Sequence, residues 1–414
     1  MAACLALSVA PALTQVAGAH TALARHQVRP GVLTDEQVAA MSPGAQASLL
    51  APLRRLADVL DALGSEGWRS SYSGVRLDAA HDLVDVFTSD AHSGHALLEA
   101  ARRVAPDARW ARVRIRQAAY SRTALDAAAA RIITGPHRAD LRAVSVAADG
   151  SGLDIETADG GLEPRGVPAG LPVAVHVRAG LPRAAKSWAD DKWHDSSPYI
   201  GGDALTTTGS KLCTAGLPAV RRADLIPVLI TAAHCFATGQ RVYTRGGRTG
   251  AFSDHRTGNF VGTVGTRNTH WDSEPLTGTR NVSAESDTYG AKPLTSLAYS
   301  YVGDYVCQDG AASYFLGHPT PCGIKVTKSD IYFSIGGHVA RGVEGVDVRT
   351  GWGSHNGDSG ATVFAIEPHN NRQARGIVSS GGLDGTRDQK RVDWVEAVDI
   401  FNAYHLKLNP KTTE

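Results

Sequence analysis

Apolar residues follow two different patterns along the chain. Up to about residue 165 they recur at helical spacing over long stretches, as from Leu49 to Leu63, which predicts amphipathic helices. The alanine-rich stretch from Ser121 to Ile132 predicts a further helix. Short apolar runs, such as Leu83 to Phe87 and the two that flank Asp149 to Gly152, predict a strand and a hairpin. Together these patterns predict a small α+β domain over residues 25–165.

The pattern changes in the second half of the chain. From about residue 195 onward Gly, Thr and Ser are frequent and apolar runs are short, which predicts an all-β domain. Residues Val392 to Leu406 return to helical spacing, so we expect a closing helix there. Between the halves, Gly160 to Pro168 and Leu181 to Pro198 are irregular and contain proline, so we predict a linker or an arm over residues 166–198.

Length and charge narrow the class of protein. A chain of 414 residues is too long for one ordinary domain. Its formal net charge of +1 implies neither a nucleic-acid partner nor a membrane-surface partner.

Residues Met1 to Ala24 hold no charged side chain and offer small-residue cleavage sites, so we predict that 1–24 is a signal peptide and that the protein is secreted.

Two short segments carry the chemistry. Thr231 to Cys235 reads Thr-Ala-Ala-His-Cys, and Gly357 to Gly360 reads Gly-Asp-Ser-Gly. A serine hydroxyl is a weak nucleophile, and an imidazole whose pKa lies near neutrality can take its proton during attack. We therefore predict that His234 is a general base and Ser359 a nucleophile. Small residues around Ser359 would let the N–H groups of Gly357 and Ser359 point together as an oxyanion hole.

These motifs, in the order His then Ser, resemble the chymotrypsin-like serine peptidases, and especially the bacterial streptogrisin and alpha-lytic protease branch. The resemblance covers roughly the last half of the chain. It implies two antiparallel β-barrels with a C-terminal helix over 199–414, with the histidine in the first barrel and the serine in the second. It also implies that the α+β domain at 25–165 is a pro-region, which helps the protease domain to fold and blocks its cleft until it is removed.

The family places an Asp between the His and the Ser, just before an apolar strand. Asp287, followed by Thr-Tyr-Gly-Ala, fits this best and is the predicted third catalytic residue. Asp272, Asp254 and Asp304 also lie in the interval. The polar surroundings of Asp272 and Asp254 favour a solvated turn carboxylate, and Asp304, between Gly303 and Tyr305, is expected in a turn. The resemblance further implies that Gly353, Ser379 and Gly381 line the substrate site, a list that comes from the family pattern alone.

The cysteines fit the same class. Of the five, Cys4 lies in the predicted leader and four lie in the C-terminal half. The family pattern pairs Cys213 with Cys235 and Cys307 with Cys322. Since His234 adjoins Cys235, a metal site is the alternative, but no Cys-x-x-Cys or His-x-x-x-His spacing supports one. We therefore expect no metal and no cofactor.

Two functions remain open. The first is a secreted serine endopeptidase that forms an acyl-enzyme and is made as a precursor, with a protein or peptide substrate and its own pro-region as partners. The second is a protease-fold binding protein with weak catalysis. Gly360 is followed by Ala361 and Thr362, where active members of the family usually have Gly-Pro, and this departure keeps the second function open. At Gly353 trypsin-like members have an Asp, so a preference for basic residues is not supported.

Overall fold

The structure of the chain is a computed structural model. It describes residues 32–135, 141–157, 170–177, 191–193, 195–208, 211–246, 257–287, 291–318, 320–382 and 387–409. The predicted signal peptide, the linker Gly160 to Pro168 and Asp254 lie outside the described residues.

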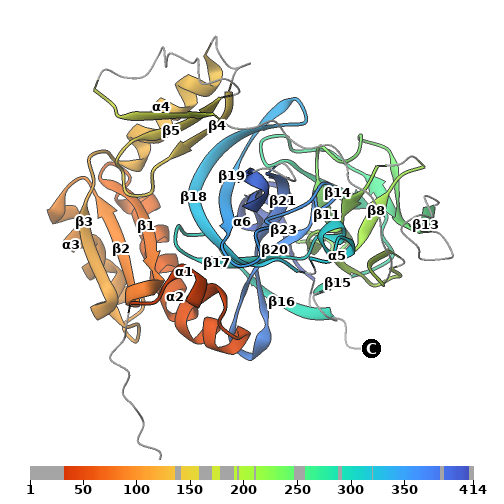
Figure 1. Cartoon of the computed structure of the whole chain (residues 1–414), viewed down its shortest axis with the longest axis horizontal. Helices are drawn as coiled ribbons and strands as arrows, with labels where there is room; N and C mark the ends of the chain where they lie inside the picture. Colours follow the sequence, from red (N-terminus) through yellow and green to blue (C-terminus); the bar gives the residue numbers. More distant parts are fainter. Residues whose placement is uncertain are drawn as a thin grey trace, which may run out of the picture. The chain divides into compact units, whose positions relative to one another are not determined.

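The helices and strands predicted for the first half are present (Figure 1). Its helices are α1 (Asp35–Ala39), α2 (Pro43–Gly67), α3 (Ala91–Val104) and α4 (Arg122–Thr134). Its strands are β1 (Tyr72–Asp78), β2 (Leu83–Thr88), β3 (Val113–Gln117), β4 (Leu141–Val146), β5 (Leu153–Thr157) and β6 (Val173–Val177). Strand β6 pairs with β5 and lies inside the stretch 166–198 that the sequence predicted as a linker or an arm.

Helix α2 shows how the sequence determines this region. Ser42 caps the helix by accepting a hydrogen bond from the Ala45 N–H, and Pro43 occupies its first turn, where no N–H is needed. The apolar stripe of α2 is buried against the sheet β1-β2-β3, with Leu53, Leu56 and Leu60 almost fully covered. Each buried leucine contributes on the order of 2 kcal/mol to folding, so this face fixes the helix on the sheet.

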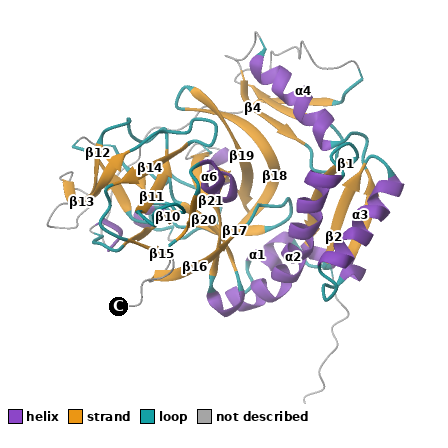
Figure 2. Cartoon of the chain, turned by 180° about the vertical axis from the view of Figure 1, so that it is seen from behind, coloured by secondary structure: helices purple, strands orange, loops and turns teal. Residues whose placement is uncertain are grey.

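The second half is almost entirely strands and loops, whereas most helices belong to the first half (Figure 2). An eight-stranded sheet has the order β23-β10-β11-β14-β13-β12-β8-β9, and a twelve-stranded sheet contains β4 to β7, β15 to β22. Among the described residues, none of the helices is long and apolar enough to cross a membrane. The strands are β7 (Tyr199–Gly201), β8 (Ala204–Thr206), β9 (Cys213–Thr214), β10 (Pro218–Arg221), β11 (Pro227–Ala232), β12 (Arg241–Arg245), β13 (Thr257–Val264), β14 (Ser273–Thr277), β15 (Val282–Asp287), β16 (Ala291–Leu297), β17 (Tyr305–Gln308), β18 (Cys322–Ile335), β19 (His338–Asp347), β20 (Thr362–Ile366), β21 (Arg372–Gly381), β22 (Arg391–Glu396) and β23 (Leu406–Leu408), and the helices are α5 (Ala311–Phe315) and α6 (Ala397–Ala403).

The all-β character of the second half is confirmed, while the closure of its sheets into two barrels stays a prediction. The predicted closing helix is shorter than expected, because Arg391–Glu396 forms β22 between β19 and β21 and only Ala397–Ala403 is helical. Disulfides join Cys213 to Cys235 and Cys307 to Cys322, which is the pairing that the family resemblance implied.

Contacts of β4 and α2 are among those that join the first half to the second. Strand β4 pairs antiparallel with β18, with Val144 opposite Tyr332. Helix α2 contributes the buried Arg54, whose Nε lies 2.9 Å from an Asp304 carboxylate oxygen and whose other nitrogens reach the carbonyl oxygens of Tyr305 and Ile366. Asp304 is therefore part of a buried ion pair, and it follows directly on the turn at Gly303 that the sequence analysis expected.

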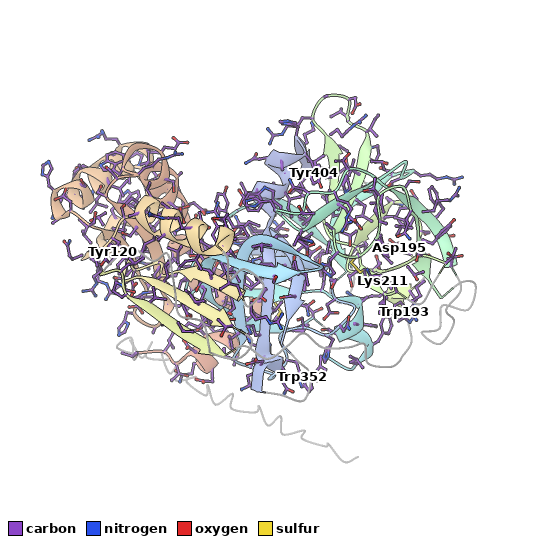
Figure 3. The ribbon with its side chains drawn as sticks, turned by 90° about the horizontal axis from the view of Figure 1, so that it is seen from above. Tyr120, Trp193, Asp195, Lys211, Trp352 and Tyr404 are labelled. Atoms are coloured by element: carbon purple, nitrogen blue, oxygen red, sulfur yellow. A yellow bond between two sulfur atoms is a disulfide. The ribbon has the colours of Figure 1, made fainter. Side chains whose placement is uncertain are left out.

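A short segment before β7 inserts into the second half. The Lys192 ammonium is buried and donates to the Asp309 carbonyl oxygen at 2.7 Å. The adjoining Trp193 is fully buried, and its ring stacks on Phe315 of α5 with 3.6 Å between centroids. Figure 3 labels Trp193 beside the strands of the eight-stranded sheet, where Ala204 of β8 completes its apolar surroundings.

We expect Arg54→Ala to destabilise the full-length chain by about 3–5 kcal/mol. The substitution removes a hydrogen-bond donor from the buried Asp304 carboxylate and from the carbonyl groups of Tyr305 and Ile366. The neighbouring Arg55, whose ion pair with Asp107 is exposed on both sides, is the matched control, and Arg55→Ala should cost less than about 1 kcal/mol. Urea unfolding of both variants, made with Ser359→Ala to prevent self-digestion, measures the difference. Equal losses would contradict the importance of the buried pair.

Candidate active site

The position of His234 follows from the burial of β11. This strand lies between β10 and β14, and its last residues are fully buried. It ends at Ala232, and the Cys235 N–H turns back to donate to the Ala232 carbonyl at 3.0 Å. The disulfide between Cys235 and Cys213 holds this turn against β9. The sequence therefore places the histidine at a rigid strand end.

Ser359 lies in a loop that is fixed from several sides. Gly357 has a φ of 111°, a conformation that residues with a side chain rarely adopt. The buried Asp358 carboxylate accepts hydrogen bonds from the N–H groups of Ser313 and His355, at 2.8 and 2.7 Å. Thr214 of β9 donates its N–H to the Ser359 carbonyl at 2.8 Å. The loop that carries Ser359 is thus tied to the strand that carries the first disulfide.

The two predicted residues lie in hydrogen-bond contact. The Nε2 atom of His234 is 2.8 Å from the Ser359 Oγ, and its Nδ1 atom is 2.7 Å from the Asp272 Oδ2. An ionised carboxylate only accepts hydrogen bonds, so Nδ1 carries the proton and Nε2 is free to accept the serine hydroxyl proton. This is the arrangement in which an imidazole can act as a general base on a serine.

The structure corrects the choice of the carboxylate. Asp272, which the sequence analysis set aside as a solvated loop residue, is fully buried and occupies the position expected for Asp287. Asp287 ends β15, opposite Ala291 of β16 in the twelve-stranded sheet. The misleading signal was the polar pair Ser273-Glu274 after Asp272, which begins the buried strand β14, paired with β11, and is not part of a loop.

Asp272 is held in an unusual conformation and kept ionised. Its φ of 29° is strained for a residue with a side chain, so the surrounding contacts must maintain it. Burial alone would raise the pKa of Asp272, but the charge and hydrogen bond of His234, together with a hydrogen bond from His338, hold it below its ordinary value. At neutral pH the carboxylate is therefore charged and able to stabilise a protonated His234.

The loop before β14 is anchored from the C-terminal part of the chain. The Tyr404 hydroxyl, at the end of α6, donates to the Ser273 carbonyl at 2.8 Å (Figure 3). The Asn268 side chain accepts from the N–H groups of His270 and Trp271, both at 3.1 Å. The Lys211 ammonium donates to the backbone carbonyl of His234 at 2.6 Å. Hydrogen bonds thus fix the backbone of both partners of the Nδ1 contact, the Asp272 loop and His234.

The remaining predicted site residues lie on two adjoining segments. Gly353, in the loop that carries Ser359, donates its N–H to the Gln389 carbonyl at 3.0 Å. Ser379 and Gly381 lie near the end of β21, where Gly381 faces Val392 of β22. A side chain at Gly381 would collide with the Ser354 Oγ, so the two segments are closely packed there.

Among the described residues the N–H groups of Gly357 and Ser359 have no hydrogen-bond partner, which leaves them available to an oxyanion.

No protein-family model matches the chain, and no curated protein matches it. Several solved structures of bacterial chymotrypsin-like serine proteases, the class that the motifs resemble, are similar to it over half its length. A Nocardiopsis protease is 21% identical, with 51% of this chain and 98% of that chain covered and a TM-score of 0.39. Thermobifida fusca Protease A is 20% identical with the same coverage and a TM-score of 0.40. A Cellulomonas bogoriensis chymotrypsin is 22% identical, again at 51% and 98% coverage, with a TM-score of 0.38.

The neighbouring Glu274 predicts a pH dependence of stability. Burial raises the pKa of Glu274 from 4.5 to about 9, so between these values the folded protein binds a proton that the unfolded chain has lost. Stability should therefore fall as the pH rises through this window. Glu274→Gln should remove that part of the fall, because an amide keeps the hydrogen bond to the Phe236 N–H without a charge.

Melting temperatures of the Ser359→Ala protein with and without Glu274→Gln, compared at pH 5 and pH 9, measure this effect. The difference between the two proteins should grow toward pH 9 in favour of glutamine. Glu99→Gln, at an exposed position on α3, is the control and should not change the pH slope. A slope unchanged by Glu274→Gln would show that this carboxyl titrates normally.

Proposed function

We propose that the protein is a secreted serine endopeptidase that hydrolyses peptide bonds through an acyl-enzyme. The observation that carries the proposal is the continuous line of hydrogen bonds from Asp272 through His234 to Ser359, at 2.7 and 2.8 Å. A nucleophile, a base and a group that orients the base are together the minimum set for this chemistry. In this assignment Asp272 takes the role that the sequence analysis gave to Asp287.

The geometry suggests a mechanism in two halves. The Ser359 Oγ attacks the carbonyl carbon while His234 Nε2 takes the hydroxyl proton, and Asp272 stabilises the resulting imidazolium. The N–H groups of Gly357 and Ser359 stabilise the oxyanion of the tetrahedral intermediate. His234 then returns the proton to the leaving amine, which frees the new N-terminus. Water, deprotonated by the same imidazole, then attacks the ester carbon. As the bond to the Ser359 Oγ breaks, His234 returns this proton to the serine oxygen and the acid is released.

An extended peptide is the substrate that the neighbouring strand would suit. Near Ser379, one edge of β21 is paired with β22. The other edge is paired with β20 and the residues before it only as far as Val378, and after Val378 no described residue pairs with that edge. A peptide could add to that free edge by backbone hydrogen bonds, which gives affinity independent of side chains. Gly353 and Gly381 would then lie close to the side chain that precedes the cleaved bond. The proposal needs no metal or cofactor.

Labelling with a fluorophosphonate tests the proposal, because this reagent reacts readily with a serine hydroxyl that an adjacent base activates. We expect the exported protein to be labelled at Ser359, and Ser359→Ala to lose both label and peptide hydrolysis. His234→Ala should lose nearly as much, since the serine is then without a base. Exported protein that takes up no label would favour the alternative of a protease-fold binding protein.

The two aspartates form a matched pair of variants. Asp272→Asn should lower kcat roughly 10³-fold to 10⁴-fold, because an amide in place of the carboxylate favours the wrong imidazole tautomer. Asp287→Asn changes the same chemical group at the end of β15 and should leave kcat within about twofold. Steady-state kinetics on one peptide substrate compare them. The reverse result would restore Asp287 as the catalytic carboxylate.

We further propose that residues 25–165 are a pro-region that helps the protease domain to fold. Support comes from the pairing of β4 with β18 and from the buried contact of Arg54 with Asp304. Sheets made of distant strands form slowly, so a preformed partner for β18 would lower the barrier. The uncharged Met1 to Ala24 and the two disulfides support export.

Expression of residues 182–414 alone should give little active enzyme, and separate co-expression of 25–181 should restore it. The added fragment includes β4, so it can supply the partner of β18. A fragment that carries Arg54→Ala should restore less activity than one that carries Arg55→Ala. Full activity and normal yield of 182–414 alone would show that the first half is not needed for folding.

A further inference from the structure

A second histidine contacts the buried aspartate. The Nε2 atom of His338, the first residue of β19, lies 3.2 Å from the Asp272 Oδ1. The same oxygen accepts the His234 backbone N–H at 3.0 Å, and Oδ2 accepts His234 Nδ1 at 2.7 Å. Among the described residues, His234 and His338 are the two that hydrogen-bond to this carboxylate.

We propose that His338 is a positioning residue for the reaction: by donating its Nε2 proton to Asp272 it fixes the carboxylate that orients His234. The proposal rests on the proposed function and names a residue that supports the same site. An ionised carboxylate can only accept, so the His338 nitrogen that faces it must carry a proton. His338 does not touch Ser359 or the reacting bond and therefore acts through Asp272.

The carboxylate needs a second donor because it is buried. Removing an ionised group from water costs free energy unless hydrogen bonds replace its hydration. Asp272 is fully buried and has a strained φ of 29°. The Ser379 hydroxyl, although buried, makes no hydrogen bond to it or to another described residue. His338 thus supplies the only side-chain donor to Oδ1 within the part of the chain that the structure describes.

The turn between β18 and β19 places His338 there. Gly336, with a φ of 56°, lies so close to His234 that an added Cβ would be 2.7 Å from the His234 Cβ. A residue with a side chain would therefore push the turn away from the catalytic histidine. Farther along β19, the Arg341 N–H donates to the His270 carbonyl at 2.9 Å, and its guanidinium lies 5.8 Å from the Trp271 ring centre. The hairpin thus holds both the imidazole and the Asp272 loop.

Two substitutions separate the hydrogen bond from the packing. His338→Phe keeps a ring but has no donor, so it should lower kcat about tenfold to a hundredfold with KM unchanged within about twofold. His338→Gln keeps a side-chain N–H that can reach a carboxylate, so it should recover most of that loss. His95→Phe, the same substitution at an exposed position on α3 without a contact to Asp272, is the matched control and should behave as wild type.

A measurement that does not depend on turnover keeps the inference separate from the proposed function. In the protein with ¹⁵N-labelled histidine, the Nδ1 proton of His234 should give a low-field NMR signal that shifts in His338→Phe and returns in His338→Gln. This holds even if wild type is not labelled by fluorophosphonate, a result that would overturn only the proposed function. An unshifted signal together with wild-type kcat in His338→Phe would overturn the role of His338.

Discussion

A carboxylate that is buried and still charged must be surrounded by hydrogen-bond donors, and this requirement organises the site. Asp272 has no contact with water, so its two oxygens depend on donors from other parts of the chain. One set comes from His234, after β11, and another from His338, at the start of β19. The loop that carries Asp272 is fixed in turn by Tyr404 at the end of α6. Three distant segments must therefore fold together before the imidazole is oriented.

The residues that short motifs encode were predictable from the sequence. His234 and Ser359 each lie in a segment whose neighbours are small because the backbone is tightly packed there, and such local requirements leave a recognisable string of residues. Helix α2 was also predictable, since the periodicity of its apolar residues matches one buried face. Strand β2 was predictable as a short apolar run, which is buried almost throughout. In all of these elements the local sequence and the tertiary environment favour the same structure.

Asp272 was not predictable, because its surroundings are polar in sequence and buried in the structure. Glu274 belongs to a covered strand and retains its proton at neutral pH, so a residue that signals solvent lies in the interior. The closing helix was overestimated for a related reason: the apolar positions of Arg391–Glu396 fit a helix, but neighbouring strands on both sides make it β22. His338 offers no local signal at all, since its role depends on a hairpin that folds back onto Asp272, 66 residues earlier in the chain.

The buried Lys192 and Trp193 have a consequence for what counts as one folded unit. Trp193 covers the ring of Phe315, and Lys192 donates to Asp309, a residue shortly before the helix whose Ser313 holds Asp358. A polypeptide that started at Ile200 would lose both anchors and would leave an aromatic face and a carbonyl group exposed beside the loop that carries Ser359. The folded unit of the second half thus begins ahead of its first strand, β7, and Lys192 and Trp193 of the connecting segment belong to its interior.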